Sequence, residues 1–138
     1  MTIEAMKIEA MTIELQIARW TALLWIVCGL SHLLHPRRWV ELLFPFREQR
    51  TGGFVLAFLS LPFGLIMIVG HNVWVWDIPV IVTLAGWMTT LKCTTYLLFP
   101  DAHRRVMSIN ARPEVAFRMG GAVMFVLGLV VGYDSFFG

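Results

Sequence analysis

The stretch HNVWVWD at residues 71–77 lies at the middle of the 138-residue chain and separates two long apolar runs. It contains no Lys or Arg. Trp74 and Trp76 are typical of the boundary between hydrocarbon and lipid headgroups, because an indole is apolar in body and polar at its N–H edge. The stretch therefore predicts an outward-facing loop that joins the two halves of a membrane protein.

The composition also favours a membrane protein. Hydrophobic residues make up 58% of the chain and charged residues 14%, and the mean hydropathy is +0.73. A soluble domain is usually about a quarter charged. The formal net charge of +2 is too small to indicate nucleic-acid binding. We therefore expect membrane lipids and not nucleic acid as partners.

Four apolar segments have the length of a membrane span, about 20 residues for a hydrocarbon layer of about 30 Å. They cover residues 17–35, 51–70, 78–99 and 115–133. The predicted fold is an all-α integral membrane bundle of four transmembrane helices. Pro62 falls inside the second span, where it is expected to kink the helix.

The first 16 residues precede the spans and repeat with a period of five, as MTIEA, MKIEA and MTIEL. This period matches neither a helix nor a strand, so no continuous apolar face is expected. The segment can be read as an amphipathic arm in the membrane interface or as an unordered leader, and the second reading is preferred. The predicted organisation is then a leader over 1–16, a two-helix unit over 17–70, the loop 71–77 and a second unit over 78–138.

Basic residues cluster in the two connections that follow the first and third spans. Together the two segments hold eight of the eleven Lys and Arg residues, Arg37, Arg38, Arg47, Arg50, Arg104, Arg105, Arg112 and Arg118. Connections rich in Lys and Arg stay in the cytoplasm. The sequence therefore predicts cytoplasmic connections, with both termini and residues 71–77 external.

Both basic connections are expected to form short amphipathic helices in the interface. In the first, apolar residues such as Trp39 and Phe46 would face lipid, and Pro45 would break the helix. In the second, Asp101 would cap a helix that carries Arg104 and Arg105 on its polar side. Arg37, Arg38, Arg104 and Arg105 are the predicted contacts to anionic lipid.

The two halves repeat one another. LLHPRR at 33–38 corresponds to LLFP at 97–100, and RTGG at 50–53 corresponds to RMGG at 118–121. The offset is 64 residues at the prolines and 68 at the glycine pairs, so the second connection is four residues longer. The matched order indicates two tandem two-helix units with the same orientation in the membrane.

These motifs carry a resemblance. Each half resembles very small two-helix bacterial inner-membrane proteins of unknown function. Residues 17–133 are similar to uncharacterised four-helix membrane proteins in which a His-Asn-x-Trp loop, here 71–74, precedes a Gly-Trp and a Lys, here Gly86, Trp87 and Lys92. The resemblance implies a fold and a location in a bacterial inner membrane, and it implies no activity.

Small residues predict where helices pack. Gly128 and Gly132 form a GxxxG pattern in the fourth span, and Ser60 and Gly64 are its counterpart in the second. Small residues one turn apart let helix backbones approach closely in a membrane. We expect both spans to contact another helix through these faces, within the bundle or across a homo-oligomer.

Lys92 and His32 are the candidates for chemistry inside the spans. A charge within a membrane is costly, so Lys92 indicates either a ligand or lipid site or a side chain that extends to the headgroups. His32 could ligate a pigment or haem, although such histidines more often form structural hydrogen bonds. Among the external residues His71, Asn72 and Asp77, a cap and a turn are favoured over a cation site. No metal site and no resident cofactor are predicted.

The leading functional reading is a non-enzymatic accessory or scaffolding subunit that packs with itself or with a larger membrane complex and holds anionic lipid. The alternatives are a small transporter or channel subunit, with Lys92 lining a polar path, and a pigment or haem carrier through His32.

Overall fold

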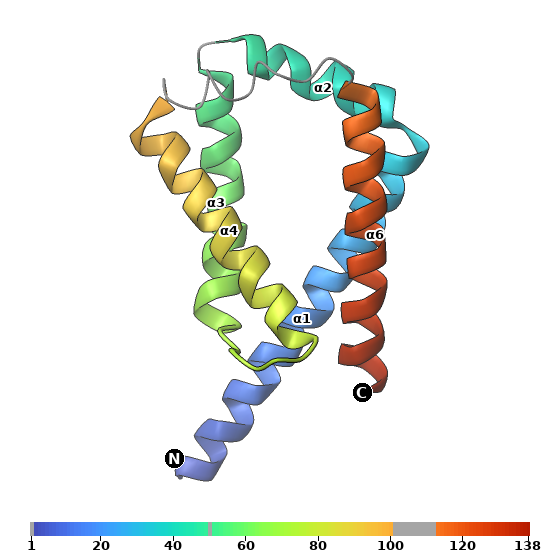
Figure 1. The fold of residues 1–138 in the computed structure, drawn as a ribbon. Helices are drawn as coiled ribbons and strands as arrows, with labels where there is room; N and C mark the ends of the chain where they lie inside the picture. The colour runs from blue at the N-terminus through green and yellow to red at the C-terminus, as the bar shows by residue number, and fades with distance from the viewer. Residues whose placement is uncertain (1, 50, 101–112) are drawn as a thin grey trace.

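The computed structural model describes residues 2–49, 51–100 and 113–138. These residues contain five helices and no strand, so the all-helical class is confirmed. With the labels of Figure 1, the helices are α1 Ile3–Leu34, α2 Pro36–Glu48, α3 Gly52–Gly70, α4 Pro79–Leu98 and α6 Pro113–Phe137. The second basic connection, with the predicted Asp101 cap, lies outside the described residues.

Helix α1 begins much earlier than predicted. It runs unbroken for 32 residues, about 48 Å at 1.5 Å per residue, so an unordered leader is wrong for residues 3–16. The Oγ1 atom of Thr2 caps its first turn by accepting from the N–H of Ala5 at 3.4 Å. The five-residue repeat is rich in Met, Glu and Ala, which favour the helix by propensity even where no apolar face forms.

Helix α2 follows α1 after a single residue, His35, and Pro36 stands in its first turn, where the missing N–H is not needed. The predicted end of this helix at Pro45 is wrong, because Pro45 lies inside α2 and the helix continues to Glu48. A Cβ on Gly52 would collide with the backbone carbonyl of Phe46, so only glycine lets α3 begin this close to α2.

Three of the helices, α1, α3 and α6, are long and apolar enough to cross a membrane. Helix α4 has 20 residues, which is long enough, but Lys92 and its threonines make it less apolar. The structure thus supports an integral membrane protein with three candidate spans rather than the four that were predicted. Pro62 lies within the continuous helix α3.

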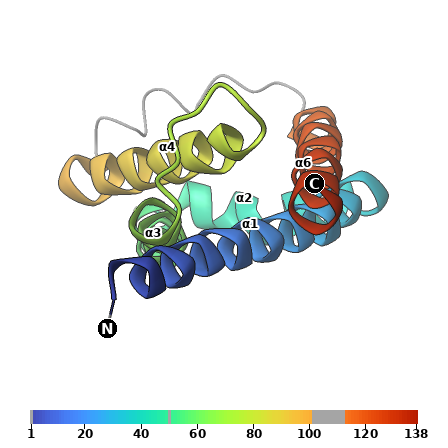
Figure 2. The ribbon, with the colours of Figure 1, turned by 90° about the horizontal axis from the view of Figure 1, so that it is seen from below.

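The long helices form two pairs, α1 with α6 and α3 with α4, and each pair packs far more closely within itself than against the other. Helix α2 lies across one end and links the pairs (Figure 1). We call this the α2 end, and the opposite end, where residues 71–78 and Gly138 lie, the loop end. Seen from below, α1 runs past α3 before it reaches α6 (Figure 2).

The buried core lies at the crossing of the four long helices. Its members are small or of medium size, and come from α1, α3, α4 and α6, namely Ala18, Ala22, Met67, Val82 and Val131. Most large apolar side chains on the helices are instead exposed. An apolar surface of this extent is typical of helices surrounded by lipid or by other membrane helices.

Candidate functional site

Glycines bring α1 and α6 into backbone contact. A Cβ on Gly128 would lie 2.8 Å from the backbone nitrogen of Ile26, and one on Gly29 would lie 2.8 Å from the carbonyl oxygen of Gly121. A Cβ on Gly132 would point towards the same helix and lie 3.6 Å from the Cβ of Ala22. Both residues of the GxxxG pattern therefore lie on the face that packs against α1.

Glycines also bring α3 and α4 into close contact. A Cβ on Gly64 would lie 2.6 Å from the Oγ1 atom of Thr90, and one on Gly86 would lie 2.7 Å from the Cβ of Met67. The buried Oγ1 atom of Thr90 has no hydrogen-bond partner among the described residues. Its approach to Gly64 is suited to a weak Cα–H···O contact, which is common where helices pack closely.

At the loop end, Thr83 fastens residues 71–77 to α4. Its Oγ1 atom accepts from the N–H of Val73 at 3.0 Å and lies 2.9 Å from the carbonyl oxygen of Val73, to which the hydroxyl donates. The same hydroxyl lies 3.3 Å from the carbonyl oxygen of His71. Thr83 is fully buried, so the loop is folded back against the first turns of the helix.

His71 lies beneath the loop with only 3% of its surface exposed. Its Nε2–H donates to the carbonyl oxygen of Pro79 at 3.0 Å, which leaves the lone pair on Nδ1. Nδ1 is buried and has no partner among the described residues. Asp77 meanwhile accepts from the N–H of Ile78 at 2.8 Å. Imidazole and carboxylate are thus each used to hold the backbone at the entry to α4.

Two indoles converge on Asn72. Its Oδ1 atom accepts from the Nε1–H of Trp74 at 2.8 Å and from the Nε1–H of Trp87 at 3.3 Å. Trp74 comes from the loop and Trp87 from the third turn of α4, and both residues remain about half exposed. Trp76 is fully exposed. The predicted turn residue, Asn72, therefore positions two aromatic side chains.

At the α2 end, the ring of His32 stacks with two aromatic rings. Trp39 of α2 stacks on it with ring centroids 4.0 Å apart, and Phe117 of α6 with centroids 5.7 Å apart. The Nδ1–H of His32 donates to the carbonyl oxygen of Cys28 at 2.6 Å, and the indole N–H of Trp39 donates to Ser31 at 3.0 Å. His32, the candidate cofactor ligand, thus connects α1 to α2 and α6. Because Nδ1 carries the proton, Nε2 is the ring nitrogen that keeps its lone pair.

The predicted lipid contacts that the structure describes are exposed. Lys92 lies on an open face of α4 beside the exposed Met88 and Leu91. Arg37 and Arg38 are exposed on α2, and Arg37 pairs with Glu41 at 3.5 Å. Such a solvated pair contributes little to stability, about 0.5 kcal/mol or less, so it leaves the guanidinium available to other anions. Arg104 and Arg105 lie outside the described residues.

Arg19 is a residue that the sequence patterns do not single out. From α1 its Nε–H donates to the carbonyl oxygen of Ser135 at 2.8 Å, and its guanidinium carbon lies 4.9 Å from the ring centre of Phe136. A cation at the C-terminal end of a helix stabilises the free carbonyls there. The only sequence signal is an arginine close to the start of an apolar run.

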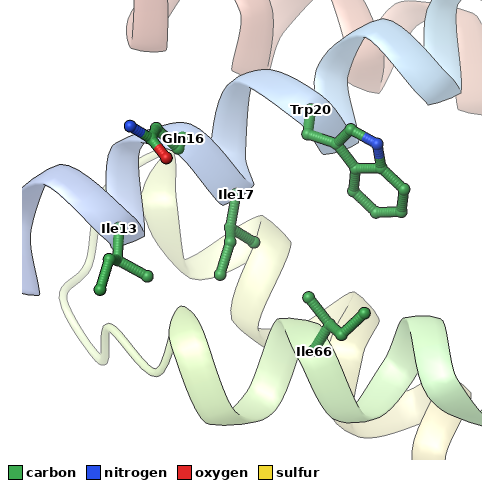
Figure 3. A pocket seen from close by; sticks show the side chains of 5 residues that line it. All are labelled: Ile13, Gln16, Ile17, Trp20 and Ile66. Carbon is green, nitrogen blue, oxygen red and sulfur yellow. The ribbon is translucent and has the colours of Figure 1, made fainter.

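One hollow of about 230 Å³ opens between α1 and α3 (Figure 3). Ile13, Ile17, Trp20 and Ile66 line it, and Gln16 lies at its edge. None of these side chains is a nucleophile or an acid–base group, and among the described residues no three His, Cys, Asp or Glu side chains gather to hold a metal ion. The lining suits hydrocarbon rather than a polar substrate.

No family model, curated protein or solved structure matches this chain.

Proposed function

We propose that the protein crosses the membrane four times, with α4 as the third span. A helix of 20 residues is about 30 Å long, which equals the hydrocarbon thickness. Close packing against α3 supports this, because a partner helix covers part of the less apolar surface. Lys92 lies six residues before the end of α4, within reach of the headgroups for an extended side chain.

We propose further that the two halves are tandem two-helix units. The first span of each unit packs on the second span of the other, α1 on α6 and α4 on α3. Two pairs of contacts support the duplication at the offsets of 64 and 68. The approach of Gly121 to His32 has its counterpart in that of Gly53 to Tyr96. The approach of Gly132 to Ile26 likewise corresponds to that of Gly64 to Thr90.

The function we propose is that of a non-enzymatic accessory or scaffolding subunit of the bacterial inner membrane. The observation that carries it is the separation of the two helix pairs, which meet at a small core towards the loop end and leave most of their large apolar side chains exposed. A second copy of the chain, or the helices of a larger complex, would cover such faces. Arg37, Arg38 and Lys92 would hold anionic lipid at the cytoplasmic side.

The test is the mass of the particle taken directly from the membrane. Polymer nanodiscs excised from native membranes retain bound subunits and lipid, and the protein mass in each disc can be measured after cross-linking within the membrane. We expect a mass above that of the single 15.7 kDa chain. A disc that contains one chain and no other protein, at native expression levels, would contradict the proposal.

A further inference from the structure

The geometry points to a binding site for an organic ammonium group at the loop end, formed by the indole rings of Trp74 and Trp87. Both indole nitrogens lie within hydrogen-bonding distance of one oxygen atom, Oδ1 of Asn72, so the two rings come together at their N–H edges. The rings stay about half exposed. We call them the indole pair.

The indole pair is held in place rather than left free. Asn72 orients both rings, and its own backbone lies between His71 and Val73, which are both bonded to the buried hydroxyl of Thr83. His71 adds a second connection to α4 through Pro79. A ring whose orientation is fixed before binding loses little entropy on binding, which raises affinity.

The electrostatics of the site favour a cation. The face of an indole ring is the strongest cation–π partner among the side chains, and aromatic cages recognise quaternary ammonium groups. Residues 71–91 contain no Lys or Arg, and Asp77 is their one carboxylate. The Asn72 oxygen already accepts from two N–H donors, so it is not free to bind the ligand. The faces of the two rings and the carboxylate of Asp77 are the groups that attract the cation.

Tryptophan is common at membrane interfaces in general, and Trp76 serves to distinguish that preference from a specific ammonium site. It is fully exposed in the same loop, two residues from Trp74, and no hydrogen bond orients its indole among the described contacts. An interfacial anchor requires exposure alone, whereas the ammonium site requires the two rings that Asn72 orients. Trp76 is therefore the matched control.

Two sources supply an organic ammonium group at this position, the headgroup of an aminophospholipid in the outer leaflet and a free ammonium solute. Tetramethylammonium is the soluble probe for both. Binding of tetramethylammonium chloride to the full-length protein in nanodiscs is measured by saturation transfer to its methyl protons, with sodium chloride keeping the ionic strength constant. This readout does not depend on the fluorescence of the six tryptophans.

We expect saturable binding to the wild type and to Trp76→Leu. Trp74→Leu and Trp87→Leu should weaken it about tenfold, because each removes one ring. Asn72→Ala, which keeps both rings but not their common acceptor, should also weaken it, and Asn72→Asp should restore it. Equal binding by Asn72→Ala and wild type, or equal losses in Trp76→Leu and Trp74→Leu, would overturn the proposal.

The lipid composition of the nanodisc then identifies the source. If the headgroup occupies the site, tetramethylammonium binds more weakly in phosphatidylethanolamine discs than in phosphatidylglycerol discs, because the lipid competes. Equal affinity in the two discs assigns the site to a free solute. The site lies at the opposite end of the molecule from Arg37 and Arg38 of α2, so its failure leaves the proposed accessory function untouched.

Discussion

Arg19 of α1 donates a hydrogen bond from Nε to the backbone carbonyl oxygen of Ser135 in α6, at 2.8 Å. The two residues are 116 positions apart, and the bond joins the first long helix to the last turns of the final one. It satisfies a carbonyl that the helix itself leaves without a partner near its end. The guanidinium also contacts the ring of Phe136. Arg19 therefore fastens the loop end of the α1–α6 pair.

Replacing Arg19 tests this role. Arg19→Met keeps the aliphatic stem but removes the donor and the charge, and should destabilise the α1–α6 pair by about 1–2 kcal/mol. Arg19→Lys should recover part of this, because it retains the charge without the planar donor group. Thermal unfolding in one fixed detergent gives both values. Equal melting temperatures for wild type and Arg19→Met would show that the contact is not stabilising.

Glycine packing gives a second prediction with a matched control eight positions away. At Gly128 a Cβ meets the backbone of Ile26, whereas at Gly120 nothing described lies within 4 Å. Gly128→Ala should therefore force the helices apart and lower the melting temperature. Gly120→Ala should be neutral or slightly stabilising, because alanine favours the helix by about 1 kcal/mol over glycine.

The same pair of variants can contradict the packing account. If Gly128→Ala and Gly120→Ala shift the melting temperature equally, the close approach at Gly128 contributes nothing specific. An unchanged elution volume in size exclusion for both variants indicates that the contact lies within one chain and not between copies.

Lys92 gives the third prediction, on lipid. A side chain that merely extends to the headgroups predicts that Lys92→Met is neutral or slightly stabilising, because insertion becomes easier. A lipid site predicts that Lys92→Met loses bound cardiolipin or phosphatidylglycerol in native mass spectrometry, with partial recovery in Lys92→Arg. We expect the loss. Lys7→Met, which removes a charge from the start of α1, is the control, and equal lipid retention in Lys92→Met and wild type would exclude the lipid site.

Much of the helical framework was predictable from hydropathy and proline positions. Pro36 marks the end of α1 within two residues, and Gly70 is both the predicted and the observed end of α3. These signals are local, because a proline ring or an apolar run acts on its own helix regardless of the rest of the chain. The helical class therefore followed from the sequence.

What the sequence could not predict depends on contacts between distant residues. Hydrophobic periodicity does not indicate the helix over residues 3–16, because that helix follows from the propensity of Met, Ala and Glu and not from an apolar face. The bonds from Thr83 back to Val73, and the convergence of Trp74 and Trp87 on Asn72, carry no sequence signature. The same holds for Arg19, whose partner is a backbone carbonyl and hence invisible in any pattern of side chains.

The topology of the third helix tests the central claim most directly. A single cysteine is placed at position 76 or 108 in a Cys28→Ser, Cys93→Ser background, and intact cells are treated with a membrane-impermeant maleimide. If α4 crosses the membrane, position 76 is labelled from outside and position 108 only after the membrane is opened, as the arginine distribution predicts. Labelling of both positions from outside would mean that α4 does not cross, and would contradict the four-span account.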